Sequence, residues 1–186
     1  MSTITLPKEA QEAAKKLPKY FVFYPDFPKP GINFWDVFSL LKNREAFDLF
    51  NTVLAGYAKV MTGKVDVVVG IEARGFLFGP LLANYLGCSF VPVRKKGKLP
   101  GKTKAITYTI EYGSDTMEIQ DDSVQSGQKV LIVDDCLATG GTLSATCELI
   151  ISLGAEIVDC LVIYRIPDVP ESGNIPASVT TLCRFV

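Results

Sequence analysis

The chain has 186 residues, of which 48% are hydrophobic and 21% charged, and this is enough to form one domain with its own core. Its 19 lysines and arginines nearly balance its 20 aspartates and glutamates, which argues against a general nucleic-acid-binding protein. The chain contains no histidine, so chemistry that depends on imidazole is excluded.

The cysteines and the hydropathy pattern predict a cytoplasmic protein that does not bind membranes. The five cysteines form no CxxC pair and stand mostly in apolar runs, as reduced core thiols do. No apolar run approaches the roughly 20 residues that span a bilayer. The first ten residues lack the basic start and apolar centre of a signal peptide.

The first third of the chain predicts two helices separated by an aromatic loop. Strong helix formers follow Pro7 and predict a short helix over 7–19. Prolines and aromatic residues crowd the segment 20–35 and predict an ordered loop that packs on its own rings. A helical stripe of apolar residues predicts a long helix over 44–61.

The rest of the chain alternates between strand and helix patterns. β-Branched and apolar runs predict buried strands at 65–69, 88–93, 129–133 and 157–163, with helices at 75–86 and 143–153. A cation-rich segment, 94–104, is expected to be exposed and mobile, and a hairpin over 106–112 and 116–119 follows it. This order predicts an α/β fold, a parallel twisted sheet with helices on both faces.

The strongest functional signal follows the predicted strand at 129–133. That strand ends in Asp134 and Asp135, and the chain then turns through small residues into a helix. Ligands bind at the carboxyl ends of strands in open α/β sheets. Small residues leave backbone N–H groups free to face an anion, and a helix N-terminus adds partial positive charge. A phosphate-binding turn is therefore predicted, made of Ala138, Thr139, Gly140, Gly141 and Thr142.

The two aspartates extend this prediction to a sugar phosphate. Adjacent carboxylates would repel phosphate, so they are expected to accept hydrogen bonds from sugar hydroxyls. A tight turn with an aspartate cap is the structural alternative. No GK[ST] follows, so the turn is not a Walker motif, and it is not GxGxxG, which argues against a dinucleotide.

The segment VLIVDDCLATGGT resembles the 5-phosphoribosyl-1-pyrophosphate motif of type I phosphoribosyltransferases. YPDFPKPGINF, GIEARGFLFGP, RKKGKLPG and IEYGSDTMEIQ resemble the adenine phosphoribosyltransferases, and together the matches extend from residue 24 to 148. The resemblance implies a type I phosphoribosyltransferase-like fold in which 1–186 form a single domain. Residues 1–36 would hold an N-terminal helix and a hood over the base, and 94–119 a mobile catalytic loop.

The resemblance also implies an activity. Adenine and 5-phosphoribosyl-1-pyrophosphate would give AMP and pyrophosphate, a pentosyl transfer in purine salvage. Glu111 would be the catalytic carboxylate, with Tyr112 beside it on the mobile loop. Mg²⁺ would be carried by the substrate near Asp134 and Asp135, without a cage of protein ligands.

Further positions of the resemblance imply contacts with pyrophosphate and the base. Arg74 would bind pyrophosphate, and Arg94, with Lys98 nearby, would reach it across the interface of a homodimer. An ion pair with Glu72 or a surface acid is the alternative for Arg74, and a solvated charge run is the alternative for the basic segment.

In the hood, backbone groups around Asn33 and Trp35 would read the base edge, Phe34 would stack on the base, and Ile166 would cover its other face. An aromatic core plug is the alternative for the hood.

Two rival functions stay open at this stage. One is a transferase for a 6-oxopurine such as hypoxanthine, guanine or xanthine, because Trp35 and Arg165 stand where the family usually has an arginine and an acid. The other is a regulator that binds phosphoribosyl pyrophosphate without catalysis. The intact loop and the net charge of -1 favour an enzyme over a regulator that binds nucleic acid.

Overall fold

The longer helices lie where the sequence predicts them, whereas the short helix at 38–42 was not predicted. The structure, a computed structural model, describes residues 4–27, 30–110, 113–167, 169, 173–183 and 185. The predicted bounds of the helices at 44–61 and 75–86 are confirmed, and the first helix gives way to a 3₁₀ turn next to Pro18. The helices are α1 (Lys8–Lys16), the 3₁₀ turn η1 (Leu17–Tyr20), α2 (Phe38–Lys42), α3 (Arg44–Met61), α4 (Gly75–Leu86) and α5 (Gly141–Ser152).

The strands of the described residues form two sheets. Two of them, β1 (Val22–Tyr24) and β2 (Phe34–Asp36), make an antiparallel pair in the aromatic segment that was expected to be a loop. The other seven make one sheet in the order β5-β6-β4-β3-β7-β8-β9. They are β3 (Val67–Ile71), β4 (Ser89–Lys95), β5 (Thr103–Ile110), β6 (Gly113–Gln120), β7 (Lys129–Leu137), β8 (Glu156–Arg165) and β9 (Val179–Cys183).

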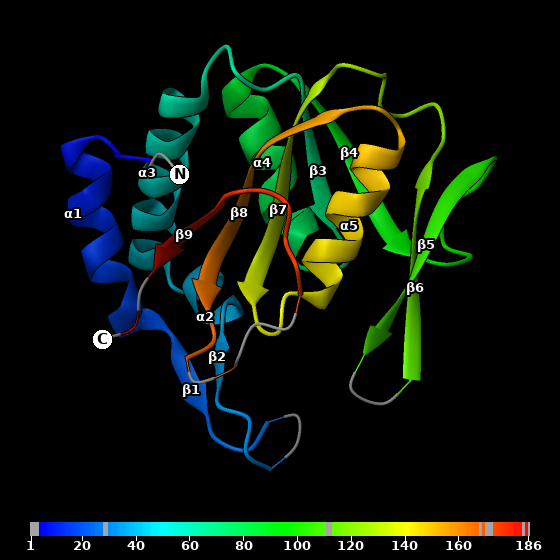
Figure 1. The fold of residues 1–186 in the computed structure, drawn as a ribbon. Coiled ribbons are helices and arrows are strands. Elements are labelled where there is room, and N and C mark those ends of the chain that lie inside the picture. Colours follow the sequence, from blue (N-terminus) through cyan, green and yellow to red (C-terminus); the bar gives the residue numbers. More distant parts are fainter. Residues whose placement is uncertain are drawn as a thin grey trace.

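The large sheet confirms the predicted α/β fold. Strands β4, β3, β7, β8 and β9 run parallel, and the β5–β6 hairpin joins β4 in antiparallel orientation. The helices cover both faces of the sheet, with α3 and α4 on one and α5 on the other (Figure 1). The hairpin projects from the edge of the sheet beside α5 (Figure 1).

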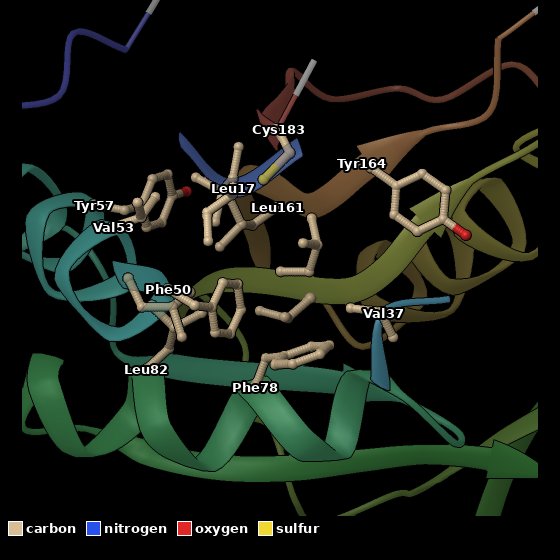
Figure 2. Packing of buried hydrophobic residues seen from close by; sticks show 14 of the residues in the cluster. Leu17, Val37, Phe50, Val53, Tyr57, Phe78, Leu82, Leu161, Tyr164 and Cys183 are labelled. Carbon is tan, nitrogen blue, oxygen red and sulfur yellow. The ribbon is translucent and has the colours of Figure 1, made fainter. Parts of the chain in front are cut away.

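Alternating residues of the central strands build a core on each face. Val68 on β3 and Leu131 on β7 belong to the core under α3 and α4, whereas Val69 and Ile132 belong to the core under α5. Strands buried on both faces need such continuous apolar runs. Figure 2 shows the first core, in which Phe50 of α3 and Phe78 of α4 lie over the sheet.

Close packing at the start of α4 fixes the two central strands relative to this helix. A Cβ added at Gly75 would lie 2.4 Å from the carbonyl oxygen of Val133, so only glycine lets α4 begin against β7. Because β3 and β7 are parallel neighbours, their carboxyl ends open at one edge of the sheet. The predicted phosphate turn leaves β7 at this edge.

The cysteines match the expectation from their apolar surroundings. All five are free, and Cys147, Cys160 and Cys183 are buried. Within the part of the chain that the structure describes, no helix is both long and apolar enough to cross a membrane.

Candidate active site

A cavity of about 290 Å³ lies where β7 passes into α5. The β3–α4 loop, the end of β7 with the following turn, and the β5–β6 hairpin all contribute to its wall. Arg74 lines this cavity together with every residue predicted to hold the sugar phosphate, namely Asp134, Asp135, Ala138, Thr139, Gly140, Gly141 and Thr142. The fold therefore brings these predicted residues together.

The turn at the start of α5 presents hydrogen-bond donors to the cavity. Gly140 precedes the helix with φ +84°, a left-handed conformation that favours glycine. The N–H groups of the first helical turn have no partner within a helix, so those of Gly141 and Thr142 are available to an anion. Thr139 and Thr142 add hydroxyl groups.

A later segment of the chain supports this turn from behind. The N–H of Gly173 donates to the carbonyl oxygen of Thr139 at 3.0 Å. The hydroxyl of Ser144 donates to the backbone carbonyl oxygen of Asn174 at 2.9 Å. A Cβ at Gly173 would come within 2.6 Å of the backbone of Gly140, so the two segments are in close contact. The turn is held in place before any ligand binds.

Asp134 and Asp135 lie side by side but have different partners. The Arg74 guanidinium pairs with the buried Asp135 carboxylate. Asp134 instead accepts the N–H of Asp135 at 2.8 Å. Burial, and after it the charge of Asp135, raise the pKa of Asp134 well above its usual value. Arg74 thus holds the carboxylate of Asp135 in place, whereas the surroundings of Asp134 disfavour its ionised form.

Arg74 contacts a second part of the predicted site. Its guanidinium carbon lies 5.7 Å from the ring centre of Phe34, which places the arginine between Asp135 and the aromatic hood. Burial opposes the charge of Arg74, but Asp135 outweighs this effect and raises the arginine pKa. Arg74 therefore forms an ion pair, but its partner is the buried Asp135 of the site and not Glu72 or a surface acid, as the alternative had it.

Arg94 lies near the end of β4 and Lys98 in the segment that follows it, and neither is among the residues that line the cavity. Arg94 donates twice to the carboxylate of Glu72, at 3.1 Å each, and once to the carbonyl oxygen of Lys98 at 3.0 Å. The guanidinium hydrogen bonds from Arg94 lower the pKa of Glu72. Glu72 therefore holds Arg94 within its own chain in this structure.

The buried carboxylate of Glu118 orders the cation-rich segment after β4. It accepts the N–H groups of Lys98 and Leu99 at 3.0 Å each and the hydroxyl of Thr103 at 3.2 Å. Burial by itself raises its pKa, but these donors outweigh burial and the pKa of Glu118 lies below its usual value. The segment was expected to be mobile, yet its backbone has a fixed anchor.

The hairpin and the end of β4 contribute cavity residues that were not selected from the sequence. Tyr108 on β5, Asp115 on β6 and Lys95 on β4 line the cavity, and Lys95 pairs with Asp115 at 3.0 Å. The hydroxyl of Tyr108 lies 3.0 Å from that of Thr142 in the phosphate turn. The available signal was alternation along the hairpin, which places Tyr108 on the same face of β5 as the partly buried Ile106.

The aromatic hood packs on itself and on Phe185. Phe34 lies 5.3 Å from Phe27, and Trp35 stacks on Phe185 at 4.8 Å between ring centres. Asn33 is exposed. Trp35 thus has the packing expected of an aromatic plug, whereas Phe34 faces Arg74.

Ile166 is placed next to the phosphate turn by the backbone. It is buried, and its N–H donates to the carbonyl oxygen of Leu137 at 2.9 Å. Arg165, the preceding residue, is exposed. The predicted catalytic Glu111 and its neighbour Tyr112 lie outside the described residues.

The geometry agrees with the relatives of this sequence. Residues 37–180 match the phosphoribosyl transferase domain. The chain is 54% identical to an adenine phosphoribosyltransferase of Acidobacterium capsulatum over 134 residues, which are 72% of each protein. It is 51% identical to that of Rattus norvegicus over 139 residues, 74% of this chain and 77% of the relative. The chain belongs to the adenine phosphoribosyltransferase family.

A solved structure of this family has the same fold. Adenine phosphoribosyltransferase of Saccharomyces cerevisiae, crystallised with an imino-altritol bisphosphate and adenine, is 40% identical. It superposes with a TM-score of 0.83 over 94% of this chain and 98% of the yeast chain. The predicted type I phosphoribosyltransferase fold is thereby confirmed.

Proposed function

We infer that this enzyme makes AMP and pyrophosphate from adenine and 5-phosphoribosyl-1-pyrophosphate, a purine salvage reaction. One observation carries the inference. In a chain of the adenine phosphoribosyltransferase family, a single cavity contains an anion-binding turn, two adjacent carboxylates and an arginine. These groups match the 5-phosphate, the ribose hydroxyls and the pyrophosphate of one substrate.

The chemistry creates charge that these residues are placed to stabilise. N9 of the purine forms a bond to C1 of the ribose while the bond from C1 to pyrophosphate oxygen breaks, and positive charge develops on the sugar ring. Asp134 and Asp135 accept hydrogen bonds from the ribose hydroxyls and lie near this charge. Arg74 binds the departing pyrophosphate. To do so, its guanidinium leaves the carboxylate of Asp135 and pairs with phosphate oxygens.

The cavity suits a substrate that arrives with Mg²⁺. Its charged lining residues include four acids, Glu72, Asp115, Asp134 and Asp135, but two cations, Arg74 and Lys95. The described residues contain no group of three or more acids or cysteines that could hold a metal alone. Asp134 and Asp135, together with hydroxyl, phosphate and water oxygens, would hold the ion, which would neutralise charge on the leaving pyrophosphate.

The hood and the hairpin would complete the site around the base. Phe34 would stack on adenine, backbone groups of Asn33 and Trp35 would read its edge, and Ile166 would cover its other face. The loop at 94–119 would close over the substrates and exclude water. This closure would bring Glu111 and Tyr112 to the purine. Glu111 would then manage a proton of the ring.

The assembly and location of the enzyme are part of the same proposal. The chain would act as one domain in a cytoplasmic homodimer, in which Arg94 and Lys98 reach the pyrophosphate of the neighbouring site. The exposed apolar side chain of Leu77 on α4 is available for association. No nucleic acid is expected as a partner.

The test is pyrophosphate release from phosphoribosyl pyrophosphate with adenine, hypoxanthine, guanine and xanthine, each with Mg²⁺ and with a chelator. Adenine should be turned over fastest, and the chelator should abolish release. Equal or faster turnover of an oxopurine would show that adenine is not the preferred substrate. Tight binding of the sugar phosphate without release from any purine would instead identify a regulator.

A further inference from the structure

Tyr108 connects the hairpin to the phosphate turn. It stands on β5, lines the cavity, and places its hydroxyl 3.0 Å from the hydroxyl of Thr142. Its ring packs with Ile106 against the core under α5, so the side chain is supported from the hairpin side. The two hydroxyls come from segments 34 residues apart in the sequence and meet at the wall of the cavity.

Either hydroxyl can donate in this hydrogen bond. A phenol is a stronger acid than an aliphatic alcohol, which favours Tyr108 as the donor and the oxygen of Thr142 as the acceptor. The proton of Thr142 is then directed away from Tyr108. Thr142 is the second residue of α5, where N–H groups and no carbonyl groups face the end of the helix, so this proton can be donated to an anion bound there.

Hydrogen bonds in such a chain strengthen one another. When Tyr108 donates to the oxygen of Thr142, the O–H of Thr142 becomes a better donor to a phosphate oxygen. Without Tyr108, this hydroxyl would be free to rotate and would lose part of its preference for the anion.

We propose that Tyr108 is a positioning residue for the ribose 5-phosphate, which it serves by orienting the hydroxyl of Thr142. The inference rests on the proposed function, in which the turn holds that phosphate. It also links an occupied turn to the hairpin, because Tyr108 stands on β5.

The test compares ligands with and without a 5-phosphate. Tyr108→Phe removes one hydroxyl and keeps the ring, and Tyr85→Phe removes an exposed hydroxyl on α4 as the matched control. Calorimetry would measure the Kd of AMP, ribose 5-phosphate and pyrophosphate for each protein. Tyr108→Phe should weaken AMP and ribose 5-phosphate about threefold to tenfold and leave pyrophosphate unchanged. It should raise KM for phosphoribosyl pyrophosphate more than it lowers kcat.

A second pair of variants tests whether Tyr108 acts through Thr142. In a Thr142→Val background, Tyr108→Phe should have no further effect on ribose 5-phosphate binding, whereas in Thr142→Ser, which keeps a hydroxyl, its effect should persist. Additive losses, or equal weakening of pyrophosphate, would overturn the inference and leave Tyr108 as a packing residue. If the unmodified enzyme itself failed to bind ribose 5-phosphate and to release pyrophosphate, the proposed function would fail first.

Discussion

At the scale of single residues, the site depends on an unequal pair of carboxylates. Asp135 is neutralised by Arg74, whereas Asp134 is partly buried beside that charged pair and has its pKa raised. A carboxylate that is costly to ionise in the free enzyme can be stabilised by the cationic sugar of the transition state. In the proposed reaction, function and stability therefore make opposite demands on Asp134.

Replacing Asp134 by Asn separates these demands. Turnover should fall at least about 100-fold, because the amide carries no charge to meet the oxocarbenium ion. At neutral pH, the free energy of unfolding should rise by about 1 kcal/mol or more, because the native state no longer holds a carboxylate with a raised pKa. Chemical denaturation and steady-state assays would measure both effects.

The pH dependence of the Asp134→Asn effect provides its control. For a carboxyl with a raised pKa, the stabilising contribution is fully present below the ordinary aspartate pKa and is lost as pH rises through the raised value. The variant and the unmodified enzyme should therefore converge in acid and diverge toward neutral pH. A difference that stays constant with pH would show that charge at Asp134 is not the cause.

At the scale of elements, Glu118 explains how a cation-rich segment keeps its shape. The carboxylate receives backbone N–H groups from Lys98 and Leu99 and a hydroxyl from Thr103, so β6 holds the turn between β4 and β5. Hydrogen bonds to a charged acceptor are among the stronger ones in proteins. The anchor acts on the backbone and leaves the side chain of Lys98 exposed.

Replacing Glu118 by Gln should loosen this segment. The free energy of unfolding should fall by about 1–3 kcal/mol at neutral pH, and the amides of Lys98 and Leu99 should exchange faster with deuterium. Glu156→Gln, at an exposed position on β8, is the matched control. Unchanged exchange at these two amides would contradict the anchoring role.

The lowered pKa of Glu118 sets the direction of its pH dependence. Its stabilising contribution is present above the ordinary glutamate pKa and is lost as pH falls through the lowered value. The deficit of the Gln variant should therefore shrink in acid, the reverse of the trend expected for Asp134. A deficit that grows in acid would contradict this assignment.

Sequence patterns predicted the elements that carry strong periodicity. The apolar stripes of α3 and α4 and the β-branched runs of β3 and β7 are local signals, and the structure confirms them. Short elements were missed because tertiary contacts define them. β9 has five residues and becomes a strand by pairing with β8, and α2 is separated from α3 by the cap residue Asn43.

The residues of the candidate site also fall into a group that local sequence patterns predict and a group that tertiary contacts define. The phosphate turn and the two aspartates are contiguous in sequence, so their spacing alone indicated a sugar-phosphate site. The partners of Arg74 and Tyr108 are 61 and 34 residues away, respectively. No local pattern contains such a pairing, and it follows from the parallel order of β3 and β7 and from the hairpin at the sheet edge.

At the scale of the whole molecule, one buried hydrogen-bond group joins α3 to β8 and to the segment just before β9. The hydroxyl of Tyr57 on α3 donates to Asp159 on β8 at 2.7 Å, and Ser178, just before β9, donates to the other carboxylate oxygen at 2.8 Å. Asp159 is fully buried. Removing one of these donors leaves an oxygen of the buried Asp159 carboxyl group without a hydrogen bond, which destabilises the folded state.

The Tyr57→Phe variant should therefore unfold more easily without a change in chemistry. The expected loss is about 1–3 kcal/mol in the free energy of unfolding, with kcat and KM of the folded enzyme retained. Tyr85→Phe serves as the control because its hydroxyl is exposed. A loss of kcat larger than the loss of folded protein would show that this group also acts on the site.

Association of two copies is tested by mixing inactive variants. If Arg94 serves the neighbouring site, a dimer of one Arg94→Ala chain and one Glu111→Ala chain has one intact site and one doubly damaged site. Activity should then recover partly on mixing, while each variant alone stays inactive. No recovery after verified exchange of chains would mean that each site is complete within one chain, as the Arg94–Glu72 pair of this structure allows.

The stacking of Trp35 on Phe185 gives the enzyme a natural optical probe. Trp35 is the only indole of the chain, and it stands on β2 beside Phe34. Its fluorescence emission therefore reports on the hood and on no other region. Titration with adenine should alter that emission without any attached dye, whereas inorganic phosphate, which is expected to bind in the turn at 138–142, should leave the spectrum unchanged.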